Sequence, residues 1–106
     1  MLFNGELPTS VGTIYTAPLP TPGITRSGAN VEIDFFRVVN ESGSARTFTI
    51  YTNIDGTRRA LTPIDTQLPT GAAFDDLPVF QIPPGALIDA EADAAGVSWS
   101  INAVIL

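Results

Sequence analysis

The sequence predicts an all-β protein: a single antiparallel β-sandwich of about seven or eight strands, immunoglobulin-like or jelly-roll in strand order. Apolar and polar residues alternate with a period of two in several segments, whereas helical periodicity is hard to find. Nine Gly and nine Pro interrupt these segments, and 44% of the residues are hydrophobic, enough for one core. We therefore expect residues 1–106 to form one domain, with residues 1–10 as an extended N-terminal arm.

The first predicted strands lie in the N-terminal half. Residues 11–18, VGTIYTAP, are rich in β-branched and aromatic residues and stop at a proline. Residues 19–30 read as a loop broken by proline and glycine. Residues 31–40, VEIDFFRVVN, form the next strand, in which apolar residues change face near Phe35. This change predicts either a β-bulge there or a strand buried on both faces.

The stretch VVNESGSARTFTIY, residues 38–51, reads as two apolar strands around a polar turn. We expect residues 38–40 and 46–51 to be antiparallel neighbours, with residues 41–45 as the hairpin tip and Gly43 supplying a positive φ. Asn40-Glu41-Ser42 also has the acceptor pattern for N-glycosylation. Because no signal peptide is recognisable at the start of the chain, we attribute this match to turn residues.

Further turns divide the second half of the chain. Asp55-Gly56 is a strong signal for a two-residue hairpin, which we prefer to a fragmentary calcium loop. A short strand is expected at residues 79–82, followed by a Pro-Pro-Gly turn. The next strand places Ile88, Ala90 and Ala92 inside and Asp89, Glu91 and Asp93 outside, and residues 97–106 form a closing strand with Trp99 on its apolar face.

The missing residue types exclude most catalytic chemistry. The chain has no Cys, no His and no Lys, so all five positive charges are Arg. This removes cysteine-based zinc sites, histidine general bases and Schiff-base lysines. The net charge of −6 disfavours binding to nucleic acid and to anionic membranes. We therefore expect no enzyme activity, no cofactor and no metal.

Two groups of acidic residues are candidate sites. Asp75-Asp76 precedes Leu-Pro and is interpreted as a solvated turn. The alternating acids Asp89, Glu91 and Asp93 could hold a hard cation such as Ca²⁺, but positions two apart on a strand are about 6.6–7 Å apart. A solvated face is the preferred interpretation, and the question of a cation stays open.

The two ends of the chain are apolar, MLF at the start and AVIL at the end. Free ends usually fray, and we expect neighbouring subunits to hold these. Arg58 and Arg59, which follow the Asp-Gly turn, are further candidates for binding acidic groups on a partner. The predicted interface residues are Met1, Leu2, Phe3, Arg58, Arg59, Val104, Ile105 and Leu106.

Four segments together resemble a group of small phage virion structural proteins. They are an Ile-Tyr-Thr-x-Pro strand at 14–18, a VVNESGSART segment at 38–47, a Gly-x-x-Arg-x-Leu-x-Pro segment at 56–63, and a Gly-Ala-x-Ile-x-Ala-x-Ala strand at 85–92. The resemblance covers nearly the whole chain and carries no catalytic residues. It implies a β-sandwich that decorates or completes a virion.

From this resemblance we expect a non-enzymatic capsid decoration (cement) protein of a bacteriophage. It would assemble in the host cytoplasm as a homo-oligomer, with a trimer as one arrangement, and bind the major capsid protein or other virion proteins. The alternative is a carbohydrate- or receptor-binding module of a tail, collar or fibre. That alternative requires exposed aromatic residues, for which Tyr15 and Tyr51 are the candidates.

Overall fold

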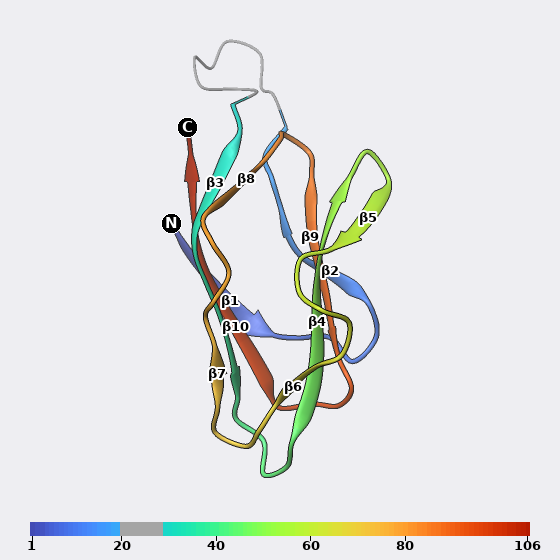
Figure 1. Cartoon of the computed structure of the whole chain (residues 1–106). Helices are drawn as coiled ribbons and strands as arrows, with labels where there is room; N and C mark the ends of the chain where they lie inside the picture. The colour runs from blue at the N-terminus through green and yellow to red at the C-terminus, as the bar shows by residue number, and fades with distance from the viewer. Residues whose placement is uncertain (20–28) are drawn as a thin grey trace.

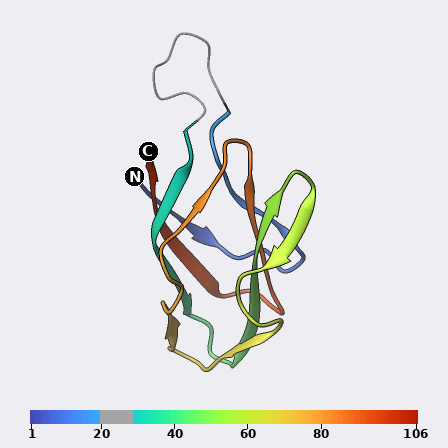
Figure 2. The same cartoon turned by 45° about the horizontal axis from the view of Figure 1, so that its top comes forward.

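A computed structural model describes residues 1–19 and 29–106, so most of the loop predicted at 19–30 lies outside the described residues. Within these ranges the chain forms ten β-strands and no helix. The strands make two antiparallel sheets that pack face to face as a sandwich (Figures 1 and 2). The predicted all-β sandwich is confirmed. The strand count exceeds the prediction because residues 57–74 contain three short strands that are too brief to show alternation.

Each sheet contains five strands, two of which are short and lie one after the other along the same side of a long strand. Sheet A runs β1 (Leu2–Glu6), β10 (Val97–Ile105), β3 (Val31–Asn40), and then two short strands along β3, which are β7 (Ala73–Phe74) and β8 (Phe80–Ile82). Sheet B runs β2 (Gly12–Thr16), β9 (Leu87–Ala92), β4 (Arg46–Ile54), and then β5 (Thr57–Ala60) and β6 (Thr66–Leu68), both along β4. Residues 1–10, for which the sequence suggested an extended arm, contain the edge strand β1.

The strand order is that of a jelly roll. The first four strands pair with the later strands in reverse order: β1 with β10, β2 with β9, β3 with β8 and β7, and β4 with β6 and β5. These pairs form one long two-stranded antiparallel ribbon. The ribbon folds over on itself, so that β10 also pairs with β3, and β9 also pairs with β4. The wrap distinguishes between the two strand orders that the sequence left open, because it is the double-sheet arrangement of jelly rolls.

The core lies between the two sheets and takes the inward residue of nearly every strand. Phe48 of β4 meets Phe74 of β7 with ring centroids 5.4 Å apart, and Phe3 of β1 meets Tyr15 of β2 at 5.1 Å. Trp99 is buried, as its apolar face predicted. Since each aromatic pair joins one sheet to the other, these contacts stabilise the packing of the layers as well as burying apolar area.

A β-bulge in β3 explains why its apolar residues change face. Asn102 of β10 is opposite Phe35, and the next residue of β10, Ala103, is opposite Ile33, so Asp34 is the extra residue. The bulge leaves Ile33 and Phe36 both buried and turns Phe35 outward with 41% of its surface exposed. The first of the two predicted explanations is therefore confirmed.

The predicted hairpin at residues 41–45 is wrong. The strand before it, β3, belongs to sheet A and the strand after it, β4, belongs to sheet B, so the segment is an arch between the sheets. Gly43 is also not among the described residues with positive φ. The two strands carry buried apolar residues, such as Val38 of β3 and Ile50 of β4, but they meet through these faces and not through their edges.

Asn40 holds this arch together with a fully buried side chain. Its amide nitrogen Nδ2 donates to the carbonyl oxygens of Ser44 (2.8 Å) and Leu68 (2.9 Å). Its Oδ1 accepts from the backbone N–H of Ser42 (2.9 Å) and from the Ser42 hydroxyl (2.7 Å). The side chain is thus fully satisfied and joins the arch to the end of β6. A residue buried in this way is no acceptor for a glycan.

The Asp55-Gly56 turn is confirmed as a two-residue hairpin. It joins β4 to β5, with Ile54 opposite Thr57. Asp55 has φ 51° and Gly56 has φ 81°, as a turn with two left-handed residues requires. The turn places β5 alongside β4 at the edge of sheet B, from where the side chain of Arg58 reaches over the outer face of the sheet to Asp89.

We expect Asn40→Asp to lower the free energy of unfolding by about 2–3 kcal/mol, because the two carbonyl oxygens would lose their donor and face a carboxylate. Urea unfolding followed by tryptophan fluorescence would measure it. Asn30→Asp is the matched control, since Asn30 is exposed and, among the described residues, its side chain makes one long contact of 3.4 Å, with Gln81. An equal effect of the two changes would show that Asn40 does not hold the arch.

Candidate functional site

Both ends of the chain lie at one corner of sheet A (Figures 1 and 2). The backbone nitrogen of Met1 donates to the carbonyl of Ala103 at 2.7 Å, and the N–H of Ala103 donates to the carbonyl of Met1 at 2.9 Å. The N–H of Leu106 donates to the carbonyl of Asn30 at 3.0 Å. Hydrogen bonds within the chain therefore hold both ends, and the contact of these ends with neighbouring subunits stays a prediction.

This corner exposes a group of apolar side chains that we call the apolar end. Five of the predicted interface residues belong to it, and Phe35 joins them because Leu2 and Phe35 flank Asn102 from opposite sides in the register. Phe3 does not belong to it, since its ring packs inward against Tyr15. The apolar end consists of Met1 (78% exposed), Leu2 (68%), Phe35 (41%), Val104 (37%), Ile105 (42%) and Leu106 (43%).

Acidic residues of β3 border the apolar end. Glu32 is opposite Val104 in the register, and Asp34 accepts a hydrogen bond of 2.7 Å from the side chain of Asn102. The sequence indicated the apolar ends of the chain but missed Phe35, because only the bulge determines which way that ring points. Leu2, Phe35 and Val104 thus lie on the outer face of sheet A, with Glu32 and Asp34 beside them, whereas Met1 and Ile105 alternate with them and lie at the rim of the other face.

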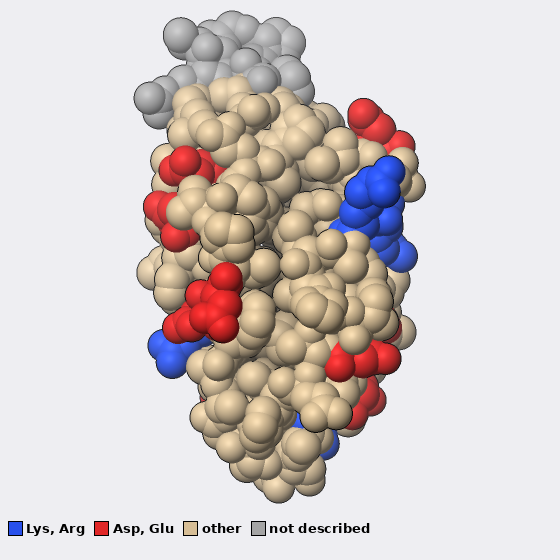
Figure 3. Space-filling model, viewed as in Figure 1, with Lys and Arg blue, Asp and Glu red and all other residues tan. Residues whose placement is uncertain are grey.

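The two predicted arginines lie elsewhere. Arg58 and Arg59 are on β5, at the edge of sheet B, where Figure 3 shows positive charge over the β4–β5 hairpin. They therefore form no common surface with the apolar end. Arg58 is also not simply a surface charge, because its side chain turns back over β4 toward β9.

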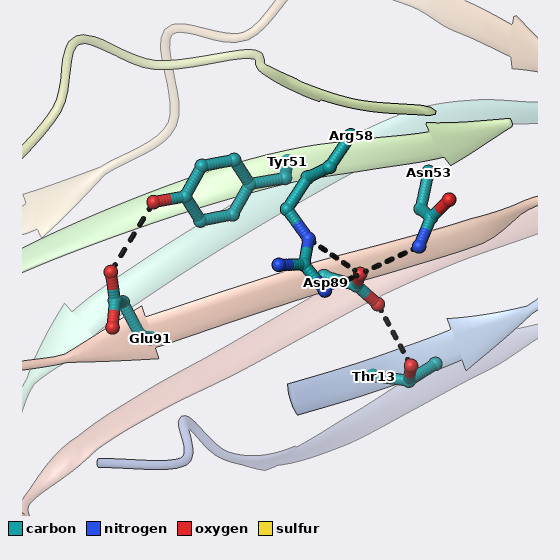
Figure 4. A network of polar contacts seen from close by, with 6 residues as sticks. All are labelled: Thr13, Tyr51, Asn53, Arg58, Asp89 and Glu91. Atoms are coloured by element: carbon teal, nitrogen blue, oxygen red, sulfur yellow. Dashed lines mark hydrogen bonds and ion pairs between the residues drawn. The ribbon is translucent and has the colours of Figure 1, made fainter. Parts of the chain in front are cut away.

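Arg58 pairs with Asp89, the middle of a polar network on the outer face of sheet B (Figure 4). Two guanidinium nitrogens of Arg58 lie 3.0 and 2.9 Å from Oδ2 of Asp89, and Asn53 donates to the same oxygen at 3.2 Å. The Thr13 hydroxyl donates to Oδ1 at 2.8 Å. Asp89 is only 1% exposed. The expectation that it lies on a solvated face is therefore wrong, because side chains of β2, β4 and β5 cover it.

The environment of Asp89 favours its charged form. Burial raises the pKa of this carboxyl, but the hydrogen bonds from Thr13, Asn53 and Arg58, together with the charge of Arg58, outweigh burial and lower the pKa. Beside it, Tyr51 donates to Glu91 at 3.2 Å, and the Arg58 guanidinium lies 5.7 Å from the centre of the tyrosine ring. Burial and then the neighbouring Glu91 raise the pKa of Tyr51.

The three alternating acids do not form a common site. Asp89 is occupied by Arg58, Glu91 accepts from Tyr51, and Asp93 accepts from the backbone N–H of Thr47 at 3.0 Å. In residues 1–19 and 29–106 no group of three or more acidic, His or Cys side chains is placed to hold a metal ion. The network therefore acts as a structural connection between β2, β9, β4 and β5.

The tyrosines do not provide an open platform for a ligand. Tyr15 is 9% exposed and belongs to the core, and Tyr51 is half-buried with Arg58 near its ring. Both aspartates of the Asp75-Asp76 pair are exposed, as expected of a solvated turn. The apolar end thus remains the surface whose exposure most needs a functional explanation.

Comparison with family models, curated proteins and solved structures finds no match. In the described ranges there is also no helix with the length and apolar character needed to cross a membrane. Any functional argument therefore depends on the residues and surfaces of this chain.

We expect Asp89→Asn to lower the free energy of unfolding by about 1–3 kcal/mol at pH 7, because Arg58 would lose its charged partner. The folded-state pKa of Asp89 is lowered, so its contribution is complete above its unfolded pKa of about 3.9 and is lost as the pH falls through the folded value. The stability difference between the two proteins should thus shrink from pH 5 toward pH 2, measured by urea unfolding.

Asp55→Asn is the control for this comparison. Asp55 is exposed at the hairpin tip, where asparagine also tolerates a positive φ. The control should therefore leave stability at pH 7 within about 0.5 kcal/mol of the unaltered protein. A stability difference for Asp89→Asn that stays constant through the acid range would contradict the assignment of the ion pair.

Proposed function

We propose that this protein is a non-enzymatic structural component of a bacteriophage virion, in particular a capsid decoration protein that assembles as a homo-oligomer on the particle. Its partners would be further copies of itself and the major capsid protein or another virion protein. The observation that carries the proposal is the apolar end. Leu2, Phe35 and Val104 are exposed there on one face of sheet A, and Met1, Ile105 and Leu106 are exposed at the same corner, although the same chain buries apolar residues efficiently elsewhere.

An apolar surface of this kind supports protein binding. Contiguous exposed apolar patches on small soluble domains commonly mark places where another protein docks. Leu2, Phe35 and Val104 lie on strands fixed by pairing in sheet A, so they present a surface that needs little ordering on binding. The acidic border of Glu32 and Asp34 would add orientation if the partner is basic there.

Fold and composition support the same proposal more weakly. Jelly rolls occur in viral capsid domains and also in lectins, so the topology is an argument from analogy. The absence of His, Cys and Lys from the sequence leaves few residues for catalysis. The alternative of a carbohydrate-binding module of a tail or fibre has less support, since neither Tyr15 nor Tyr51 offers an open ring.

Two observations on particles would test this proposal. The chain should be found by mass spectrometry in purified virions of the phage that encodes it, and the purified protein should sediment with particles that lack it. Absence from virions together with no sedimentation would contradict the proposal. Sedimentation with tails but not with heads would favour the alternative.

Leu2→Asp and Val104→Asp should each weaken sedimentation with the particles by about tenfold or more, because a charge would have to be desolvated in the contact. Both residues are exposed, so we expect the fold to be retained, which circular dichroism would check. Ile64→Asp is the matched control, since Ile64 is 61% exposed and lies between β5 and β6 of sheet B. Equal losses for all three changes would argue against the apolar end as the contact.

A further inference from the structure

The four edges of the two sheets differ in their protection against pairing with another chain. Exposed edges commonly carry bulges, charges, prolines or very short strands that prevent such pairing. The edge strand β2 has a register shift between Thr13 and Tyr15, and β5 carries Arg58 and Arg59. The edge at β7 and β8 consists of strands of two and three residues separated by a segment containing Pro78.

The fourth edge, β1, carries only one of these protections, the charge of Glu6 at its end, and that carboxylate turns toward Gly96 of its own chain. Its five residues, LFNGE, pair with β10 without a register shift and include neither proline nor a positive charge. Four of the five are exposed. Among the described residues no strand pairs with the other side of β1. This edge is therefore open to strand addition.

The register shows which backbone groups are free. Met1 exchanges hydrogen bonds with Ala103, and the N–H of Leu7 donates to Val97, so the odd-numbered residues of β1 direct their backbone groups toward β10. Antiparallel pairing alternates, and the N–H and C=O groups of Leu2, Asn4 and Glu6 consequently point away from the sheet. These residues are the ones that a new strand would meet.

We propose that β1 pairs antiparallel with β1 of a second copy, around a two-fold axis at Asn4. In this register Asn4 is opposite Asn4 of the second copy, and Leu2 is opposite Glu6. All three outward-facing residues of each copy then exchange backbone hydrogen bonds, and sheet A continues from one subunit into the next. The contact is isologous, the commonest type in homo-oligomers.

The two neighbouring registers would leave some of the outward-facing backbone groups without a hydrogen-bond partner. An axis at Phe3 would leave Glu6 without a partner in β1, and an axis at Gly5 would place Leu2 opposite Pro8, which has no N–H to donate. The axis at Asn4 also keeps the two Glu6 side chains apart. The Glu6 carboxylate already turns toward its own chain, where it accepts from the N–H of Gly96 at 3.2 Å. The edge is therefore complementary to itself in one register.

This inference deepens the homo-oligomer in the proposed function and makes it a dimer, while the remaining apolar end stays free for the particle. The two ideas fail separately. A monomer that still sediments with particles would overturn the dimer alone, and a dimer that never sediments with particles would count against the function alone. Because each copy carries a net charge of −6, dimerisation should strengthen as salt rises.

The test is sedimentation equilibrium over a concentration series. We expect a mass that rises to twice 11.2 kDa. Asn4→Pro removes an outward N–H that β10 does not use, so it should raise the dimer dissociation constant more than about tenfold while the monomer stays folded. Asn4→Thr keeps the N–H and is the matched control. A monomer at all concentrations, a trimer, or a dimer equally stable with Asn4→Pro would overturn the proposal.

A second measurement needs no substitution. In the proposed register Phe3 and Gly5 of the second copy form a non-hydrogen-bonded pair, whose Hα atoms lie close together. In a mixture of isotope-labelled and unlabelled protein, we expect an intermolecular nuclear Overhauser effect between these Hα atoms. Intermolecular effects confined to other strands would overturn the proposal even if a dimer forms.

Discussion

The buried amide of Asn40 fixes the end of the sandwich on which the jelly-roll wrap depends. At this end the chain passes between sheets at the β3–β4 arch and again between β9 and β10. Asn40 bonds through its side chain to Ser44 and Leu68, while its backbone exchanges hydrogen bonds with Ala72 and Gly71. The next N–H, of Glu41, donates to Gly96 in the β9–β10 turn. Asn40 and Glu41 thus join both crossings to the segment between β6 and β7, and the polar groups of Asn40, which would be costly to bury alone, are all paired.

Strand positions were predictable because alternation is a local property. The strands at 31–40, 46–54, 87–92 and 97–105 follow from period two, and the Asp55-Gly56 hairpin follows from turn chemistry. The partners of β3 and β4 were not predictable, since alternation specifies which face is buried but not which strand lies alongside. A polar turn of five residues suits a hairpin and an arch equally well, and the difference lies in the long-range contacts of Asn40.

The candidate sites, too, were predictable from the sequence only where they depend on local patterns. The apolar runs MLF and AVIL indicated Leu2 and Val104 as interface candidates, but the direction of Phe35 depends on the bulge in β3. The sequence predicted a solvated Asp89 because this residue alternates with the apolar residues Ile88 and Ala90. Its burial depends on Arg58, which only the hairpin turn brings across from β5. Side chains that cover an outer face come from neighbouring strands, and a period along one strand carries no information about them.

The pairing of β1 with β10 also determines how the fold responds to mechanical load. Met1 lies beside Ala103, and the two strands are antiparallel, so both ends of the chain leave the sandwich at the same corner. A force that separates the ends would open the β1–β10 ladder one hydrogen bond at a time, as in a zipper. The same ladder pulled along its length would load all of its hydrogen bonds together. The protein is therefore weak against peeling from its ends and strong against shear along sheet A.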